Sequence, residues 1–165
     1  MFMIKSRIVA VVLILLSLST TPRMQVCAQG NPVDLKFLTI AKSGADGPTT
    51  PQFRVITTRK GWAAAWKDCT NNNPLHPGRA PAEPPEVDFS KEIVVIVAAG
   101  RSLGSNAAVT ITRLTQTDEG LVVHYQVTPG QVGTADDYSQ PIHIVRAGAD
   151  GASLAKGVRF VRESK

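Results

Sequence analysis

Ile93-Val94-Val95-Ile96-Val97-Ala98-Ala99 is the stretch that decides the fold. It is apolar without a break, it is rich in β-branched residues, and Gly100 ends it. A strand with one face in water alternates apolar and polar side chains, whereas an unbroken run of this length indicates a strand buried on both faces. We therefore expect residues 93–99 to be the central strand, with other elements packed against each of its faces.

A β-hairpin is predicted downstream of this strand. Segments 107–114 and 121–127 are apolar, and Asp118-Glu119-Gly120 between them has the residue types of a turn. Alternation along the second segment places His124 on one face and a row of large apolar side chains on the other. That row consists of Leu121, Val123, Tyr125 and Val127.

The remaining strands are short. One is expected within residues 29–51, around Leu35 to Ile40, and others at 53–56, 142–145 and 158–161. Residues 71–87 contain five prolines and hardly an apolar side chain, so we expect a surface loop there. Together these segments predict an α+β domain, in which a mainly antiparallel β-sheet packs on one short amphipathic helix.

That helix is predicted at residues 60–68. Trp62 and Trp66 stand four residues apart and share one face, three alanines favour helix, and Thr58 is placed to cap the first turn. Such an aromatic pair is typical of core packing. Stacking of a ligand on the two rings would instead make the chain a ligand-binding module, and this alternative stays open.

The first residues resemble an export signal. Lys5 and Arg7 precede the apolar run Ile8–Leu16, and Val26-Cys27-Ala28 supplies small residues at the positions that signal peptidase reads. We expect residues 1–28 to be a signal peptide that is cleaved after Ala28, so the protein would be secreted or periplasmic. The apolar run is shorter than the roughly 20 residues of a membrane-spanning helix, and no stable membrane anchor is expected.

Cleavage changes the charge of the chain. The 165-residue precursor carries +5, and loss of three basic residues with the signal peptide leaves 137 residues with a charge of +2. A chain of this size forms one core, so residues 29–165 are expected to be a single domain. The mature chain has no run of basic residues, which argues against nucleic acid as a partner.

Metal and disulfide chemistry are not expected in the mature chain. Cys69 would be its one cysteine, and a small buried residue at a helix end is the interpretation that we favour. The three histidines, His76, His124 and His143, stand far apart without the spacing of metal ligands. No cofactor-binding motif is present, so we expect no cofactor.

One pattern suggests hydrolase chemistry. Gly100-Arg101-Ser102-Leu103-Gly104 matches G-x-S-x-G directly after the central strand, and Asp136 or Asp137 and then His143 complete the order serine, aspartate, histidine. A nucleophile elbow requires a strand-to-helix turn, but the residues that follow alternate like a strand. We favour a loop role for Ser102, with a small exported serine hydrolase as the alternative.

The order of features along the chain resembles a known family. Val87-Asp88-Phe89-Ser90-Lys91-Glu92 and Pro141-Ile142-His143-Ile144-Val145 are its most specific stretches, and the pair Trp62 and Trp66 precedes both. Over residues 55–161 the chain is similar to the C-terminal domain family of PrcB, a protease-complex regulatory subunit. The resemblance implies an exported, non-catalytic accessory domain that acts by protein contact, stabilising or modulating a secreted or envelope protease.

One loop departs from the family pattern. The family usually has Thr-Gly-Gly-Tyr after the central strand, whereas this chain has Leu103-Gly104-Ser105-Asn106 and lacks the aromatic residue there. Because recognition commonly lies in loops on a rigid sheet, we expect loops 100–106 and 130–140 to contact a partner. The candidate binding residues are Arg101, Leu103, Asn106, Asp136, Asp137 and Tyr138.

Overall fold

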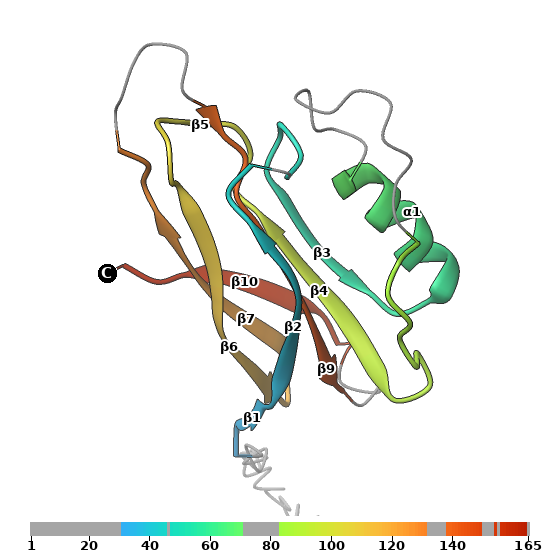
Figure 1. Ribbon diagram of the computed structural model, residues 1–165. Helices are drawn as coiled ribbons and strands as arrows, with labels where there is room; N and C mark the ends of the chain where they lie inside the picture. The colour runs from blue at the N-terminus through green and yellow to red at the C-terminus, as the bar shows by residue number, and fades with distance from the viewer. Residues whose placement is uncertain are drawn as a thin grey trace, which may run out of the picture.

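The computed structural model describes residues 31–45, 47–70, 83–131, 138–149, 154 and 156–164. The expected signal peptide, His76 and most of the proline-rich loop lie outside these residues. Strands dominate the described chain (Figure 1). The elements are β1 (Val33–Leu35), β2 (Phe37–Ser43), β3 (Gln52–Ile56), α1 (Arg59–Thr70), β4 (Glu92–Ala98), β5 (Ser102–Leu103), β6 (Ala108–Thr117), β7 (Gly120–Thr128), β8 (Tyr138–Ser139), β9 (Ile142–Gly148) and β10 (Val158–Arg162).

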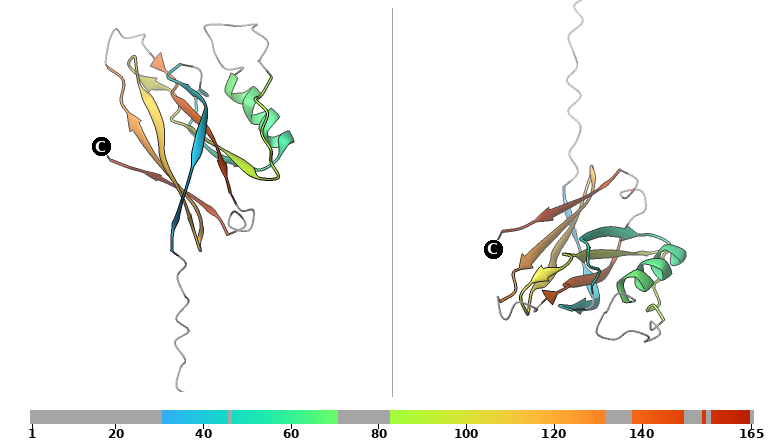
Figure 2. Two further views of the ribbon diagram at one scale, coloured as in Figure 1. Left: turned by 60° about the horizontal axis from the view of Figure 1, so that its bottom comes forward. Right: turned by 90° about the horizontal axis from the view of Figure 1, so that it is seen from above.

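Two four-stranded sheets pack face to face. One has the order β1-β6-β7-β10 and the other β2-β9-β4-β3, while β5 and β8 form a separate two-stranded ribbon. Strand β10 runs parallel to β7, and the other strand pairs of the described chain are antiparallel. Helix α1 covers the outer face of the second sheet, so the layers are helix, sheet and sheet (Figure 2). The expected α+β class, mainly antiparallel with one packed helix, is confirmed.

Strand β4 is the centre of both hydrophobic layers. Its odd-numbered side chains, Ile93, Val95 and Val97, face the other sheet, and its even-numbered ones face α1. From Ile93 to Ala98 every side chain is buried. The prediction of a strand buried on both faces is confirmed, because each face of β4 has an apolar layer of its own.

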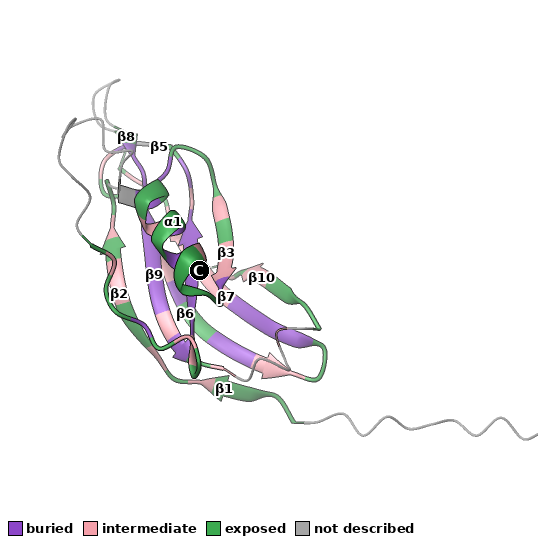
Figure 3. Ribbon diagram, turned by 90° about the vertical axis from the view of Figure 1, so that its right-hand side faces the viewer, coloured by how far each residue is buried: buried purple, intermediate pink, exposed green. Residues whose placement is uncertain are grey.

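Helix α1 is fixed at its start and along one face. The Thr58 hydroxyl accepts a hydrogen bond from the Gly61 N–H at 3.2 Å, which is the predicted N-cap. Trp62 is buried, and its indole N–H donates to the Pro85 carbonyl at 2.9 Å. Trp66 packs beside it with ring centroids 5.1 Å apart, while the opposite face of the helix is exposed (Figure 3). The two rings are therefore core packing, as expected.

Three features of the strands differ from the sequence-based expectation. Residues 29–51 contain two strands instead of one, because β1 pairs with β6 while β2 pairs with β9 in the other sheet. The strands form two four-stranded sheets and the β5–β8 ribbon, whereas one sheet was expected. Strands β5 and β8 were not predicted, since two-residue strands depend on a distant partner.

Within the described residues, no helix is both long enough and apolar enough to span a membrane.

The two sides of the sandwich are not alike. On one side the chain passes directly from β1 into β2 and so joins the sheets. On the other side β3 and β10 are the edge strands, and they lie next to each other (Figure 3). The Phe53 ring of β3 closes this open side by contacting Phe160 of β10, with centroids 5.4 Å apart, and Tyr125 of β7 at 5.3 Å.

Candidate functional site

Three loops meet at the end of the sandwich beyond β4 and β9. The Gly47 N–H donates to the Gln140 carbonyl at 2.8 Å, and the Gln140 N–H donates to the Gly44 carbonyl at 2.7 Å. The Arg101 N–H donates to the Thr49 carbonyl at 2.8 Å. Hydrogen bonds of the backbone thus join residues 44 and 47–49 to segments 100–106 and 138–141, although these segments are far apart in sequence.

The two predicted contact loops are joined most closely. Strand β5 pairs with β8, and Ser105 and Gln131 exchange two backbone hydrogen bonds of 3.0 and 2.8 Å. The Ser139 hydroxyl donates to the Gly104 carbonyl at 2.8 Å. Gly104 has φ +93°, and a side chain there would collide with the Gln131 carbonyl. Glycine is therefore required where these loops cross.

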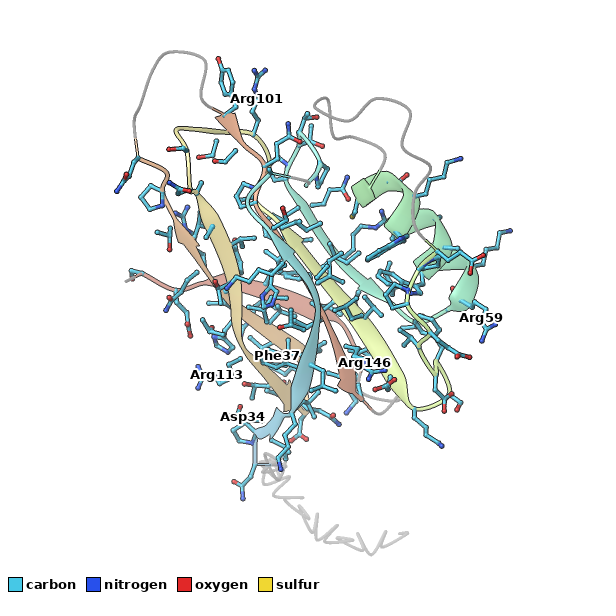
Figure 4. All side chains as sticks on the ribbon, viewed as in Figure 1. Asp34, Phe37, Arg59, Arg101, Arg113 and Arg146 are labelled. Atoms are coloured by element: carbon cyan, nitrogen blue, oxygen red, sulfur yellow. The ribbon has the colours of Figure 1, made fainter. Side chains whose placement is uncertain are left out.

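Arg101 and Tyr138 form the exposed tip of this end. The Arg101 guanidinium lies 3.5 Å from the centroid of the Tyr138 ring, which is cation–π geometry. Tyr138 remains 44% exposed, and Arg101 points away from the strands (Figure 4). Asn106 is exposed in the same loop and has φ 62°, a conformation that asparagine tolerates better than most residues.

The other candidates are placed less fully. Leu103 belongs to β5 and its backbone pairs with Tyr138, but its side chain lies outside what the structure describes. Asp136 and Asp137 also lie outside the described residues. Of the six candidate binding residues, the structure thus brings Arg101 and Tyr138 into contact and places Asn106 on the same loop as Arg101.

His143 lies inside the molecule, between the two sheets. Its Nδ1 accepts a hydrogen bond from the Ile111 backbone N–H at 2.8 Å, and its Nε2 lies 3.0 Å from the Thr39 hydroxyl. Both partners stand where a ladder shifts register, in β6 and in β2. Because Nδ1 accepts, the neutral ring carries its proton on Nε2 and donates it to Thr39. Burial, and next the charge of Lys42, lower the pKa of His143 to about 4.

Within the described residues, the ring of His143 does not contact the serine of the alternative hydrolase triad. Each ring nitrogen of His143 already has a partner, Thr39 or Ile111, and neither partner is Ser102 or an aspartate. Ser102 belongs to β5, and the chain continues from Gly104 toward strand β6 instead of entering a helix. The strand-to-helix turn of a nucleophile elbow is thus missing from this stretch.

An open pocket of about 430 Å³ lies near the start of α1. Asp88 orders its rim by accepting hydrogen bonds from the Ser90 hydroxyl at 2.6 Å and the Ser90 N–H at 3.1 Å. These bonds lower the pKa of Asp88. The charged groups of the lining largely offset one another, since Arg59 lies 3.8 Å from Glu86 and Arg146 lies 3.6 Å from Glu92.

Two further clusters were not predicted from the sequence. His124 faces away from the apolar row, as expected, and its Nδ1 lies 3.3 Å from Glu163, which also accepts a hydrogen bond from Thr112 at 2.8 Å. The rings of Phe53, Tyr125 and Phe160 form the second cluster. Both clusters depend on contacts between residues that are far apart in sequence, so no local sequence pattern predicts them. Among the residues with described positions, no three His, Cys, Asp or Glu side chains gather to hold a metal ion.

Comparisons with known proteins add no assignment. Searches of protein-family models, of curated proteins and of solved structures each found no match to this chain.

Proposed function

We propose that this chain is an exported, non-catalytic accessory domain that acts by contacting another protein, and that its partner is a secreted or envelope protease. The observation that carries the proposal is the end of the sandwich where three loops hold Arg101 against Tyr138. A cation and an aromatic ring on a backbone that is already ordered bind a partner at low entropic cost.

The resemblance to the PrcB C-terminal domain family supplies the class of partner. In that family the loop after the central strand carries an aromatic residue, and this chain lacks it there. Tyr138 pairs with Leu103 across the β5–β8 ribbon and presents an aromatic ring at the same end. The neighbouring loop thus supplies the kind of side chain that is missing from the first.

The proposal of a non-catalytic role rests on His143. A general base needs a ring nitrogen that is free to take a proton from the nucleophile. Both nitrogens of His143 have structural partners, and burial holds the pKa of the ring near 4. A fluorophosphonate probe that labels Ser102 would support the hydrolase alternative and contradict this role.

Affinity capture tests the partner. The exported chain, immobilised through its C-terminus, is exposed to the envelope fraction and the culture medium of its own cells, beside an Arg101→Ala/Tyr138→Ala variant. We expect a protease to be retained by the wild-type chain and lost with the variant. A matched control, Lys60→Ala/Lys67→Ala on the helix, retains the partner. Recovery of the same proteins with all three chains, or of no protease, would contradict the proposal.

A further inference from the structure

The outer edge of β10 presents backbone groups without a neighbouring strand in the described chain. The Leu121 N–H donates to the Gly157 carbonyl at 3.0 Å, and the Glu163 N–H donates to the Tyr125 carbonyl at 2.8 Å. Successive residues of a strand direct their backbone groups to opposite sides. Residues 157, 159, 161 and 163 therefore face β7, and the N–H and C=O groups of Val158, Phe160 and Arg162 face the open edge.

Apolar side chains border this edge on the open side of the sandwich. Val158 is 39% exposed and Phe53, from β3, is 41% exposed, whereas Phe160 between them is half-buried. The contacts of Phe53 with Phe160 and Tyr125 hold these rings as a fixed surface. A strand added along β10 would cover Val158 and the exposed part of Phe53.

The same edge is basic. Lys156, Arg159 and Arg162 are exposed, and none of the three forms an ion pair with another described residue. The nearest acidic residue along the strand, Glu163, is already engaged by Arg113 and by His124. Exposed cations on an edge disfavour pairing with a second copy of the same strand but favour pairing with an acidic strand.

We propose that the β10 edge binds an extended segment of a partner protein, in which acidic and apolar residues follow a defined pattern, by accepting it as an additional antiparallel strand. Opposite residues 162 to 156, in that order, the segment carries an acid, a β-branched residue, an apolar residue, an acid, an apolar residue, a small residue and an acid. Its apolar residues cover Phe160 and Val158, and its acids lie beside Arg162, Arg159 and Lys156. This site is separate from the Arg101–Tyr138 end, so it does not depend on the function proposed above.

The test uses a synthetic peptide, Glu-Thr-Val-Glu-Val-Ser-Glu, blocked at both ends, and the exported chain labelled with nitrogen-15. We expect binding by titration calorimetry, with the largest amide shifts in β10 and β3. In the protein, Arg159→Glu/Arg162→Glu should weaken binding about tenfold or more. Lys60→Glu/Lys67→Glu makes the same change of charge on the helix and should alter the affinity less than about twofold.

Backbone methylation of the peptide separates strand addition from simple charge attraction. The valine that faces Phe160 directs its N–H at β10, so N-methylation there should weaken binding about tenfold. The second glutamate directs its N–H away from β10, and its N-methyl form should bind within about twofold of the parent peptide.

The outcomes are distinct. Binding that is sensitive to methylation at the valine and to charge reversal on β10 supports the proposal. Equal binding of the two methylated peptides, equal binding of a peptide with lysine in place of each glutamate, or no binding at millimolar peptide overturns it. A dimer of the exported chain with protected β10 amides also overturns it, because the occupant would then be a second copy.

Discussion

His143 is a buried polar side chain, and each of its ring nitrogens requires a partner. The sequence correctly predicted a strand at this position but also suggested a catalytic triad, because the order serine, aspartate, histidine carries no information on distance. That Nδ1 meets the Ile111 N–H depends on how the sheets stack and on register shifts in two strands. Such contacts form across the whole fold and leave no local pattern.

Replacement of this histidine should destabilise the fold. His143→Leu leaves the buried Ile111 N–H without an acceptor and should lower the free energy of unfolding by about 1–3 kcal/mol. Urea unfolding followed by tryptophan fluorescence measures the loss. His124→Gln, at the half-buried cluster on the outer face, is the matched control and should change stability by less than about 1 kcal/mol. An equal loss in both variants would contradict a stabilising role for the hydrogen bond between Ile111 and His143.

The same histidine predicts how stability depends on pH. Its pKa is about 4 in the folded chain, against an ordinary value of 6.5. Between these values the unfolded chain binds a proton that the folded chain does not, so acid favours unfolding. The contribution is complete above pH 6.5 and is lost as the pH falls toward 4, by at most about 3 kcal/mol.

The comparison of two chains isolates this effect from that of the carboxylates. Unfolding free energies of the wild type and of His143→Leu are measured at about pH 7.5, 5.5 and 4.5, and the gap between the two chains should narrow as the pH falls. A gap that stays constant over this range would show that His143 is protonated alike in both states.

Cys69 shows that burial can be read from the sequence. This cysteine, at the end of an amphipathic helix, was expected in the core, and it is buried there. Burial raises the pKa of its thiol to about 11, although the charge of Arg54 acts to lower it. The group is therefore a neutral thiol at neutral pH.

Among the helices and strands, those whose position depends on nearby residues were predicted from the sequence. Helix α1 begins at its predicted cap and β4 has the buried run that its residues suggested, because capping and hydrophobic periodicity act within a few residues. The split of residues 33–43 between two sheets and the β5–β8 ribbon depend on distant partners. The apolar residues of 35–40 predict a strand but not its division between two sheets, and residues 102–103 and 138–139 carry no strand pattern.

The cap of α1 provides a prediction. Thr58→Ala removes the hydroxyl that accepts the Gly61 N–H and should lower stability by about 1 kcal/mol. The neighbouring exposed Thr57 serves as the matched control, and Thr57→Ala should be close to neutral. Thermal unfolding of both variants measures the difference, and equal melting temperatures would show that the cap contributes nothing.

The crossing of the contact loops provides another. Gly104→Ala places a side chain against the Gln131 carbonyl at a positive φ and should lower stability by about 1–3 kcal/mol. Gly148→Ala meets only the Lys91 carbonyl at 3.8 Å and should be tolerated. Amide spectra should show changes centred on β5 and β8 in the first variant alone. Undisturbed β5 and β8 amides in Gly104→Ala would contradict the packing of these loops.

In the molecule as a whole, the fold buries His143 between the sheets and leaves His124 half-buried on an outer face. Helix α1 covers one sheet face, the sheets cover each other, and His143 is enclosed between them. The two surfaces that we propose for recognition are the Arg101–Tyr138 end and the open edge at β10. The sequence proposed Arg101 and Tyr138 as binding residues, and the fold brings these two side chains into contact. The open edge could not be predicted, because it depends on which strands end the two sheets.

Nitrogen-15 spectra of the histidine rings test most directly whether His143 supports the fold instead of catalysing a reaction. A neutral ring with its proton on Nε2, unchanged from neutral pH down to about pH 5, is the predicted result. A ring that titrates near its ordinary pKa of 6.5, or that carries its proton on Nδ1, would contradict both the hydrogen bond from His143 to the other sheet and the proposal of a non-catalytic role.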